Sequence, residues 1–198
     1  MDKNRIAQQV RFIFEIDKLK NVIRQSRISD NSREENDAEH SWHLAVMALI
    51  LREYANDKDL DIFKVIKMLL IHDIVEIYAG DVHVYDIEGN KDKSIRERKA
   101  AEKIFSLLPS DQAEEYQSLW LEFDSRITNE SKYANSIDRL QPIMLNCTTE
   151  GHTWKKFEIK SPQVYEKNGH IKDGSEEIWS LVQKLLASCV QKGYLSEE

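Results

Sequence analysis

The sequence has 198 residues, of which 41% are hydrophobic and 32% charged, and its formal net charge is −7. This composition is typical of a globular protein, and the acidic balance argues against binding to a nucleic acid polymer. No apolar run reaches the length that spans a bilayer, and the charged N-terminus lacks the apolar stretch of a signal peptide, so we expect no membrane partner.

Turn-forming residues are scarce, with 6 glycines and 3 prolines, which favours long helices and an all-α fold. No repeat or linker divides the chain, so we expect a single domain over residues 1–198. Cys147 and Cys189 are far apart in the sequence and fit no metal-binding spacing. We interpret both as buried thiols in a reducing cytoplasm rather than as a disulfide.

The N-terminal part predicts two helices separated by a loop. Apolar residues recur at helical spacing over about residues 5–25, and the polar stretch SRISDNSREEN that follows predicts a loop. Asn36 is expected to begin the second helix, because Asn36 and Glu39 have the spacing of a capping box.

A third helix is expected over about residues 61–78. It is apolar on nearly all sides except at His72, Asp73 and Glu76, and Gly80 is a natural C-terminal stop. A helix that is apolar all round belongs in a core, so its polar side chains need a reason.

The second half of the chain predicts shorter helices. A loop over about residues 82–92 is followed by a charged amphipathic helix that ends before Pro109, and residues 151–174 predict irregular structure. We expect the other helices at about residues 111–123, 129–146 and 175–191.

Three ionisable residues converge near the end of the third helix. Glu76 lies four residues after His72 and three after Asp73, and these spacings share one helix face. A buried, unpaired carboxylate is costly, and a divalent metal is the simplest partner for an adjacent His and Asp. Alternatively, His72 bonds a backbone carbonyl and Asp73 pairs with an arginine. The core-like helix and the nearby carboxylate of Asp81 favour the metal.

Two candidate ligands come from other helices. His40 lies one turn inside the second helix, and Asp138 lies in the segment SIDRLQPIM among apolar residues that we expect to be buried. An aspartate among core residues is costly unless it is paired or binds a metal. Arg139 or Arg126 is the alternative partner of Asp138.

The ordered motifs AEHSW, LLIHDIVEIYAGD and NSIDRLQ resemble those of the HD-domain metal phosphohydrolases, and more closely the bacterial branch that includes the 5′-deoxynucleotidases. The resemblance spans about residues 19–154. It implies a compact helical bundle around a central metal site whose protein ligands are His40, His72, Asp73 and Asp138. This nitrogen and oxygen set suits one divalent transition metal, such as Mn, Co, Ni, Fe or Zn, better than Mg.

The resemblance also implies a metal-dependent phosphohydrolase that acts on a small phosphomonoester through a metal-activated water. Glu76 is the expected general base, and Asp81 is expected to transfer a proton or orient the substrate. We expect a nucleoside or deoxynucleoside 5′-monophosphate as substrate, and a homodimer. The Arg-Trp pair that selects the sugar in this branch is missing, because VIRQSRIS has no tryptophan, so the sequence leaves the deoxyribose preference open.

Two other functions stay open, namely a phosphatase of the same fold with a non-nucleotide substrate, and a regulatory module that binds a metal or nucleotide without turnover. The presence of both Glu76 and Asp81 argues against the second. Candidate phosphate-binding residues are Lys20, Arg24, Arg33, Lys91, Lys93 and Arg96. We interpret His43 as a partly buried histidine, and His83, His152 and His170 as surface residues.

Overall fold

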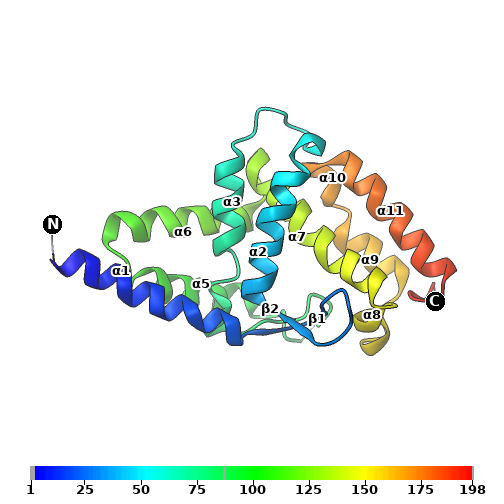
Figure 1. Cartoon of the computed structure of the whole chain (residues 1–198), viewed down its shortest axis with the longest axis horizontal. Coiled ribbons are helices and arrows are strands. Elements are labelled where there is room, and N and C mark those ends of the chain that lie inside the picture. Colours follow the sequence, from blue (N-terminus) through cyan, green and yellow to red (C-terminus); the bar gives the residue numbers. More distant parts are fainter. Residues whose placement is uncertain (1–2, 87, 198) are drawn as a thin grey trace.

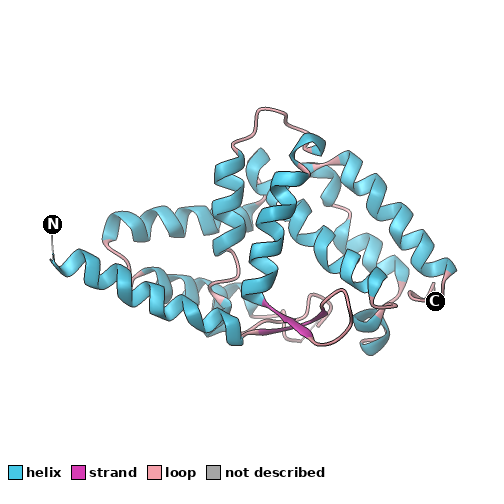
Figure 2. Ribbon diagram, viewed as in Figure 1, coloured by secondary structure: helices cyan, strands magenta, loops and turns pink. Residues whose placement is uncertain are grey.

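The computed structural model describes residues 3–86 and 88–197, and it is almost entirely helical (Figure 1). Figure 2 shows helices throughout and one short pair of strands. The predicted all-α class is therefore confirmed. In the described part of the chain, no helix is long and apolar enough to cross a membrane.

The chain begins with α1 (Lys3–Ile16), the 3-10 helix η1 (Asp17–Asn21) and the antiparallel strands β1 (Ile23–Arg27) and β2 (Glu34–Asn36). The prediction of one helix over residues 5–25 is thus wrong, and strands flank the predicted loop. The backbone turns extended at Val22, whose carbonyl accepts a hydrogen bond from the Asp37 amide at 3.1 Å. The β-branched pair at positions 22 and 23 favours this change. It places Arg24 on a strand.

The next elements are α2 (Asp37–Ile50), the 3-10 helix η2 (Arg52–Tyr54) and α3 (Ile62–Ile71). The predicted capping box is confirmed. The Asn36 side chain accepts from the Glu39 amide at 3.0 Å, and the Glu39 carboxylate accepts from the Asn36 amide at 3.3 Å. This cap fixes the entry of the chain into α2, which carries His40.

The predicted third helix is broken, because a turn over residues 72–75 separates α3 from α4 (Glu76–Ala79). In this turn the Glu76 amide donates to the Asp73 carbonyl at 2.9 Å, three residues back instead of four. The released carbonyl of His72 accepts a hydrogen bond from the indole Nε1 of Trp120 at 3.1 Å. Gly80, with φ of 77°, ends α4 as expected.

The C-terminal half contains α5 (Lys93–Phe105), α6 (Ser110–Ser125), α7 (Asn129–Thr148), α8 (His152–Lys156), α9 (Ser161–Asn168), α10 (Ile171–Gly174) and α11 (Glu176–Gln191). The longer helices begin and end within a few residues of the predicted positions, and α5 ends before Pro109. The expectation of irregular structure over residues 151–174 is wrong. Helices of four to eight residues show too few turns for their periodicity to be read, and they depend on tertiary packing.

Helix α7 lies at the centre of the bundle and contacts α2, α3, α6, α10 and α11 (Figure 1). The contact with α10 is tight at Gly174, where an added Cβ would lie 2.4 Å from the Lys132 carbonyl oxygen. Cys147 on α7 and Cys189 on α11 are free thiols that touch each other. Buried apolar side chains from Phe12 to Leu195 form a continuous cluster around this helix.

The bond between Trp120 and the His72 carbonyl generates a first prediction. Trp120→Phe keeps an aromatic ring but leaves a buried carbonyl without a donor, so the free energy of unfolding should fall by about 1–3 kcal/mol. The matched control is Trp42→Phe, because Trp42 is 64% exposed whereas Trp120 is 4% exposed. Denaturant titration of both variants measures the effect, and an equal loss in the two would contradict the assignment.

Candidate functional site

The structure brings the four predicted ligands together from three parts of the chain. His40 comes from α2, His72 and Asp73 from the turn after α3, and Asp138 from α7. The Nε2 atom of His40 lies 3.0 Å from Oδ1 of Asp138 and 3.8 Å from Oδ2 of Asp73. The Nε2 atom of His72 lies 3.2 Å from Oδ2 of Asp73 and 3.6 Å from Oδ1 of Asp138. Two imidazoles therefore face the same two carboxylates.

Each imidazole is oriented through its other nitrogen. Nδ1 of His72 lies 2.9 Å from the Leu69 carbonyl oxygen, and Nδ1 of His40 lies 3.1 Å from the side-chain oxygen of Gln141. Because both neighbours are acceptors, each Nδ1 carries a proton, and Nε2 is the nitrogen that offers a lone pair to a metal when the ring is neutral. The buried Nε2 of His72 has no hydrogen-bond partner in the structure. Lone pairs aimed at carboxylates fit a bound cation.

The charges of the site also call for a cation. Burial, aided by the charge of Arg24, lowers the pKa of His40 to about 4, so His40 has one proton for two acceptors, Gln141 and Asp138. Burial alone would lower the pKa of His72, but the carboxylates of Asp73 and Asp138 raise it to about 10. The donor atoms of His40, His72 and Asp73 lie within 4.8 Å of one another. The residues present therefore fit a divalent metal.

A second carboxylate group adjoins the first. Donor oxygens of Asp37, Asp73 and Glu76 lie within 4.8 Å of one another. Nη1 of Arg24 donates to Oδ1 of Asp37 and to Oδ2 of Asp73, both at 2.8 Å. Burial and the charge of Asp73 raise the pKa of Asp37 to about 6. The guanidinium therefore supplies the positive charge on this side of Asp73, where a second metal would otherwise be needed.

The two predicted catalytic carboxyl groups adjoin this cluster. Glu76 is 4% exposed, its Oε2 has no hydrogen-bond partner, and burial and the charges of Asp73 and Asp37 raise its pKa well above its ordinary range. Asp81 follows Gly80, is half-buried, and has its pKa raised by burial. Carboxyl groups with raised pKa values can exchange protons near neutral pH.

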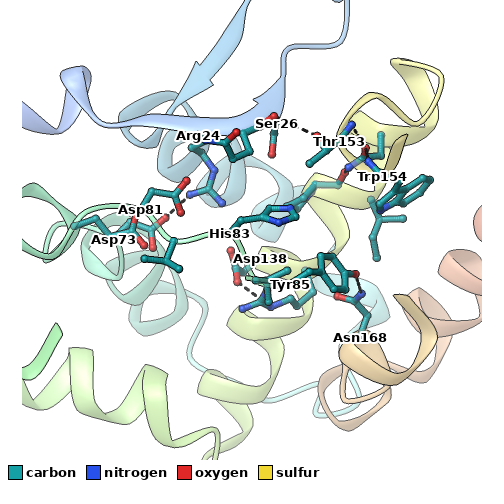
Figure 3. Close-up of a pocket in the computed structure, with 18 of the residues that line it drawn as sticks. Arg24, Ser26, Asp73, Asp81, His83, Tyr85, Asp138, Thr153, Trp154 and Asn168 are labelled. Atoms are coloured by element: carbon teal, nitrogen blue, oxygen red, sulfur yellow. Dashed lines mark hydrogen bonds and ion pairs between the residues drawn. The ribbon is translucent and has the colours of Figure 1, made fainter. Parts of the chain in front are cut away.

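Two cavities meet at the site. A cavity of about 120 Å³ is lined by Arg24, Glu76, Asp81 and both acidic ligand candidates, as Figure 3 shows in part. A larger cavity of about 900 Å³ lies against His72. Asp73, Asp138, Lys93 and Arg139 line both cavities, so the candidate metal centre lies where they meet. The Nε atom of Arg139 is 3.5 Å from Oδ2 of Asp138, and Arg126 makes no such contact.

The predicted phosphate-binding residues fall into two groups. Arg24, Lys91 and Lys93 line the cavities. The others pair with carboxylates elsewhere, in the pairs Lys20–Asp17, Arg33–Glu39 and Arg96–Asp92.

The histidine predictions were partly wrong. His83, His152 and His170 are half-buried rather than on the surface, and His83 and His170 each line a cavity. Burial lowers the pKa of His83 to about 4. His43 is half-buried, as expected.

Sequence reasoning missed the residues that support His40. Gln141 is fully buried, and its amide nitrogen donates to Oε1 of Glu35 at 2.6 Å. Burial raises the pKa of Glu35 to about 7, and Gln141 is among the groups that oppose this shift. The signal was present in part, because Gln141 lies three residues after Asp138 and therefore on the same helix face.

Gln141→Leu should weaken metal binding. The variant removes the acceptor that keeps the His40 proton on Nδ1, so the affinity for a divalent metal should fall by about 10–100-fold. Competition with a chromophoric chelator measures this affinity. Gln183→Leu, at an exposed position of α11, is the matched control. An unchanged affinity in Gln141→Leu would contradict the orienting role.

Comparisons with known proteins agree with this geometry. A solved structure described as a predicted metal-dependent phosphohydrolase, from Magnetospirillum magnetotacticum, is 47% identical with a TM-score of 0.94, and the match covers 98% of this chain and 97% of that one. A hypothetical protein from Pyrococcus furiosus, 21% identical with a TM-score of 0.63 over 92% of this chain and 99% of its own, shares the fold.

Curated relatives cover less of the chain. A 5′-deoxynucleotidase of Mus musculus is 30% identical over 70% of this chain and 68% of its own length. A 5′-deoxynucleotidase of Homo sapiens is 29% identical over 68% of this chain and 65% of its own length, so the chain spans about two thirds of these relatives. The model of the HD domain family matches residues 16–179, and the chain therefore belongs to the HD domain family.

Proposed function

We propose that the protein is a divalent-metal-dependent phosphohydrolase that releases phosphate from a nucleoside or deoxynucleoside 5′-monophosphate. The observation that carries the proposal is the convergence of His40, His72, Asp73 and Asp138, with both Nε2 atoms facing the carboxylates. A nucleotide substrate is supported by the relatives from Mus musculus and Homo sapiens, which are named 5′-deoxynucleotidases.

We assign His40, His72, Asp73 and Asp138 as the metal ligands. Mn, Co, Ni, Fe or Zn suits this nitrogen and oxygen set better than Mg. When bound, such a dication supplies Lewis acidity, lowers the pKa of a coordinated water and offsets the carboxylate charge around Glu76. The protein's own contribution is to hold the ligands, through Gln141 on one imidazole and a backbone carbonyl on the other.

Proton transfer is assigned to the two carboxyl groups beside the ligands. Water attacks phosphorus, and the bond from phosphorus to the nucleoside oxygen breaks. Glu76 accepts the proton of the attacking water, since it is a buried carboxylate beside Asp73 and its surroundings raise its pKa. Asp81, whose pKa is also raised, donates a proton to the departing nucleoside oxygen. Lys93 and Arg139, which line both cavities, bind the phosphate oxygens.

The proposal does not include a preference for deoxyribose. Gln25 follows Arg24 on β1 and lines the smaller cavity, within the stretch VIRQSRIS that lacks the Arg-Trp pair of the family it resembles. A glutamine amide can donate to a ribose hydroxyl and accept from it, whereas an indole ring offers a single donor. Ribonucleotides therefore belong in the substrate panel beside deoxyribonucleotides.

A homodimer in the cytoplasm is part of the same proposal. Ile6, Val10, Ile13 and Phe14 form an exposed stripe on α1, at spacings that share one helix face, and Phe14 is 72% exposed. Exposed apolar patches of this kind mark interfaces between proteins. The free thiols Cys147 and Cys189 suit a reducing compartment. We also propose that the chain forms one domain, because its apolar core is continuous.

Two substitutions should distinguish residues that bind the metal from residues needed only for turnover. Asp73→Ala removes a ligand, so bound metal and phosphate release should be lost together. Glu76→Ala removes only the proton acceptor, so metal should be retained while the rate falls by about 10²–10⁴-fold. The measurements are elemental analysis and phosphate release from a panel of ribo- and deoxyribonucleoside 5′-monophosphates and other phosphomonoesters.

The panel is run on protein reloaded with Mn, Co, Ni, Zn or Mg. Full metal content in Asp73→Ala would show that the ligand assignment is wrong. Phosphate release only from non-nucleotide esters would show that the substrate is not a nucleotide. Bound metal without any phosphate release would favour a regulatory module.

Ile13→Glu on α1 should convert a dimer into a monomer, because it puts a charge into the apolar stripe that we propose as the interface. Static light scattering at working concentration measures the molar mass. Leu181→Glu on α11 is the control, since Leu181 is 43% exposed and α11 lies at the opposite end of the molecule from α1 (Figure 1). A monomeric wild-type protein would contradict the proposed dimer. A monomer only in Leu181→Glu would contradict the placement of the interface on α1.

A further inference from the structure

The larger cavity offers more room than the reacting phosphate needs. Its volume of about 900 Å³ compares with about 120 Å³ for the cavity beside Glu76 and Asp81. Pockets that bind whole small molecules have about 300–1,000 Å³. The larger cavity touches the candidate metal centre at Asp73 and Asp138, and it extends from there to the end of α6 and to α9. Most of its wall therefore lies beyond the metal ligands.

Three basic side chains from separate elements line this outer part. Arg126 follows α6, Arg139 is on α7 and Lys167 is on α9. Within the described residues, Arg126 and Lys167 form no salt bridge, and Arg139 approaches a carboxylate only at Asp138. In contrast, Lys93, which lines the same cavity, forms a salt bridge in which its Nζ lies 3.4 Å from Oε1 of Glu97.

The carboxylates of the outer wall do not neutralise these cations. Asp86, Asp124 and Glu166 line the cavity, yet none of them forms a salt bridge with a basic residue in the described part of the chain. Arg126 and Lys167 thus keep their donor hydrogens available to an anion from outside the protein.

Two buried nitrogen atoms at this place also lack a partner. Nε of Arg139 and Nε2 of His170 are buried, and neither has a hydrogen-bond partner in the structure. Leaving such atoms unpaired is costly, so an acceptor bound beside them would stabilise the site. Burial and the charges of Arg126 and Arg139 lower the pKa of His170 to about 4, which keeps the imidazole neutral and able to donate. Burial and neighbouring cations, with Arg139 first among them, also lower the pKa of Lys167.

Ordinary solvated charges are the simpler explanation for Arg126 and Lys167, which are exposed. They do not explain Arg139 and His170, which line the same cavity and each hold a buried nitrogen without a hydrogen-bond partner among the described residues. Mutually repelling cations around buried donors form a site for a multiply charged anion, and arginine in particular matches the oxygen atoms of phosphate.

We propose that Arg126, Lys167 and His170 form a subsite for a second phosphate group of the substrate, and that Arg139 joins this subsite to the metal centre. The inference rests on the proposed function, since the phosphate that is hydrolysed is the one at His72 and Asp138. The substrate class is then a nucleotide with two phosphate groups. A nucleoside 3′,5′-bisphosphate fits the proposed cleavage at the nucleoside oxygen. A nucleoside 5′-diphosphate, whose terminal phosphate is joined by an anhydride bond, serves as the comparison.

The test measures binding rather than turnover. Metal-loaded Glu76→Gln protein, in which hydrolysis is slow, is titrated calorimetrically with thymidine 5′-monophosphate, thymidine 3′,5′-bisphosphate and thymidine 5′-diphosphate. A second phosphate should tighten binding by at least about tenfold, in line with one or two charge-assisted contacts. Whichever of the two diphosphorylated ligands gains affinity identifies the position of the second group.

Substitutions in this background assign the gain to the subsite. Adding Arg126→Ala and Lys167→Ala together should remove most of the advantage of the second phosphate while changing monophosphate affinity less than about threefold. Adding Lys184→Ala, at an exposed position on α11 outside the cavity, should leave the advantage intact. Circular dichroism checks that each variant is folded.

Two results would overturn the inference. One is equal affinity for the mono- and diphosphorylated ligands. The other is an equal loss for all three ligands in the double variant, which would show that the cations bind the reacting phosphate itself. A different result would refute the proposed function, namely that the wild-type protein releases no phosphate from any monophosphate. The binding comparison does not depend on that release.

Discussion

Carboxylate oxygens of Asp37, Asp73 and Glu76 lie within 4.8 Å of one another at the buried centre of the helical bundle. Asp138 adds a fourth carboxylate at the same site, beside His72. Burying charge is costly unless opposite charge is buried with it, so this concentration of carboxylates limits what else can surround it. One side is offset by the guanidinium of Arg24. The other side presents the Nε2 atoms of His40 and His72, which offset negative charge by binding a proton or a metal ion.

The departures from regular helices serve this arrangement. A continuous third helix would keep the His72 carbonyl in its own hydrogen-bond ladder, whereas the observed turn leaves it to Trp120 on α6. A continuous first helix would carry Arg24 past the site, whereas β1 presents it to Asp73. Both breaks cost local hydrogen bonding, and both place a group beside the buried carboxylates.

The sequence predicted that His40, His72, Asp73 and Asp138 lie together, because these residues stand in an ordered pattern. His40 follows a helix cap, and the pair His72–Asp73 follows an apolar helix. The sequence could not single out Arg24, since the apolar periodicity of the first helix continues through Val22 and Ile23. No pattern in the sequence predicted the proposed phosphate subsite. Lys167 lies in the region where no helix was expected, and only the packing of α9 brings it to the cavity formed with α6 and α7.

The salt bridges of Arg24 have a consequence for how the protein handles its metal. Arginine stays charged at every physiological pH, so part of the counter-charge is permanent and does not leave with the ion. His72 is likewise anchored on the protein's own backbone at Leu69. Arg24 and the Leu69 carbonyl thus hold two of the proposed ligands, Asp73 and His72, by contacts within the protein itself. At the proposed site the ligand types alone do not select one divalent transition metal, so the availability of each metal would decide which one binds.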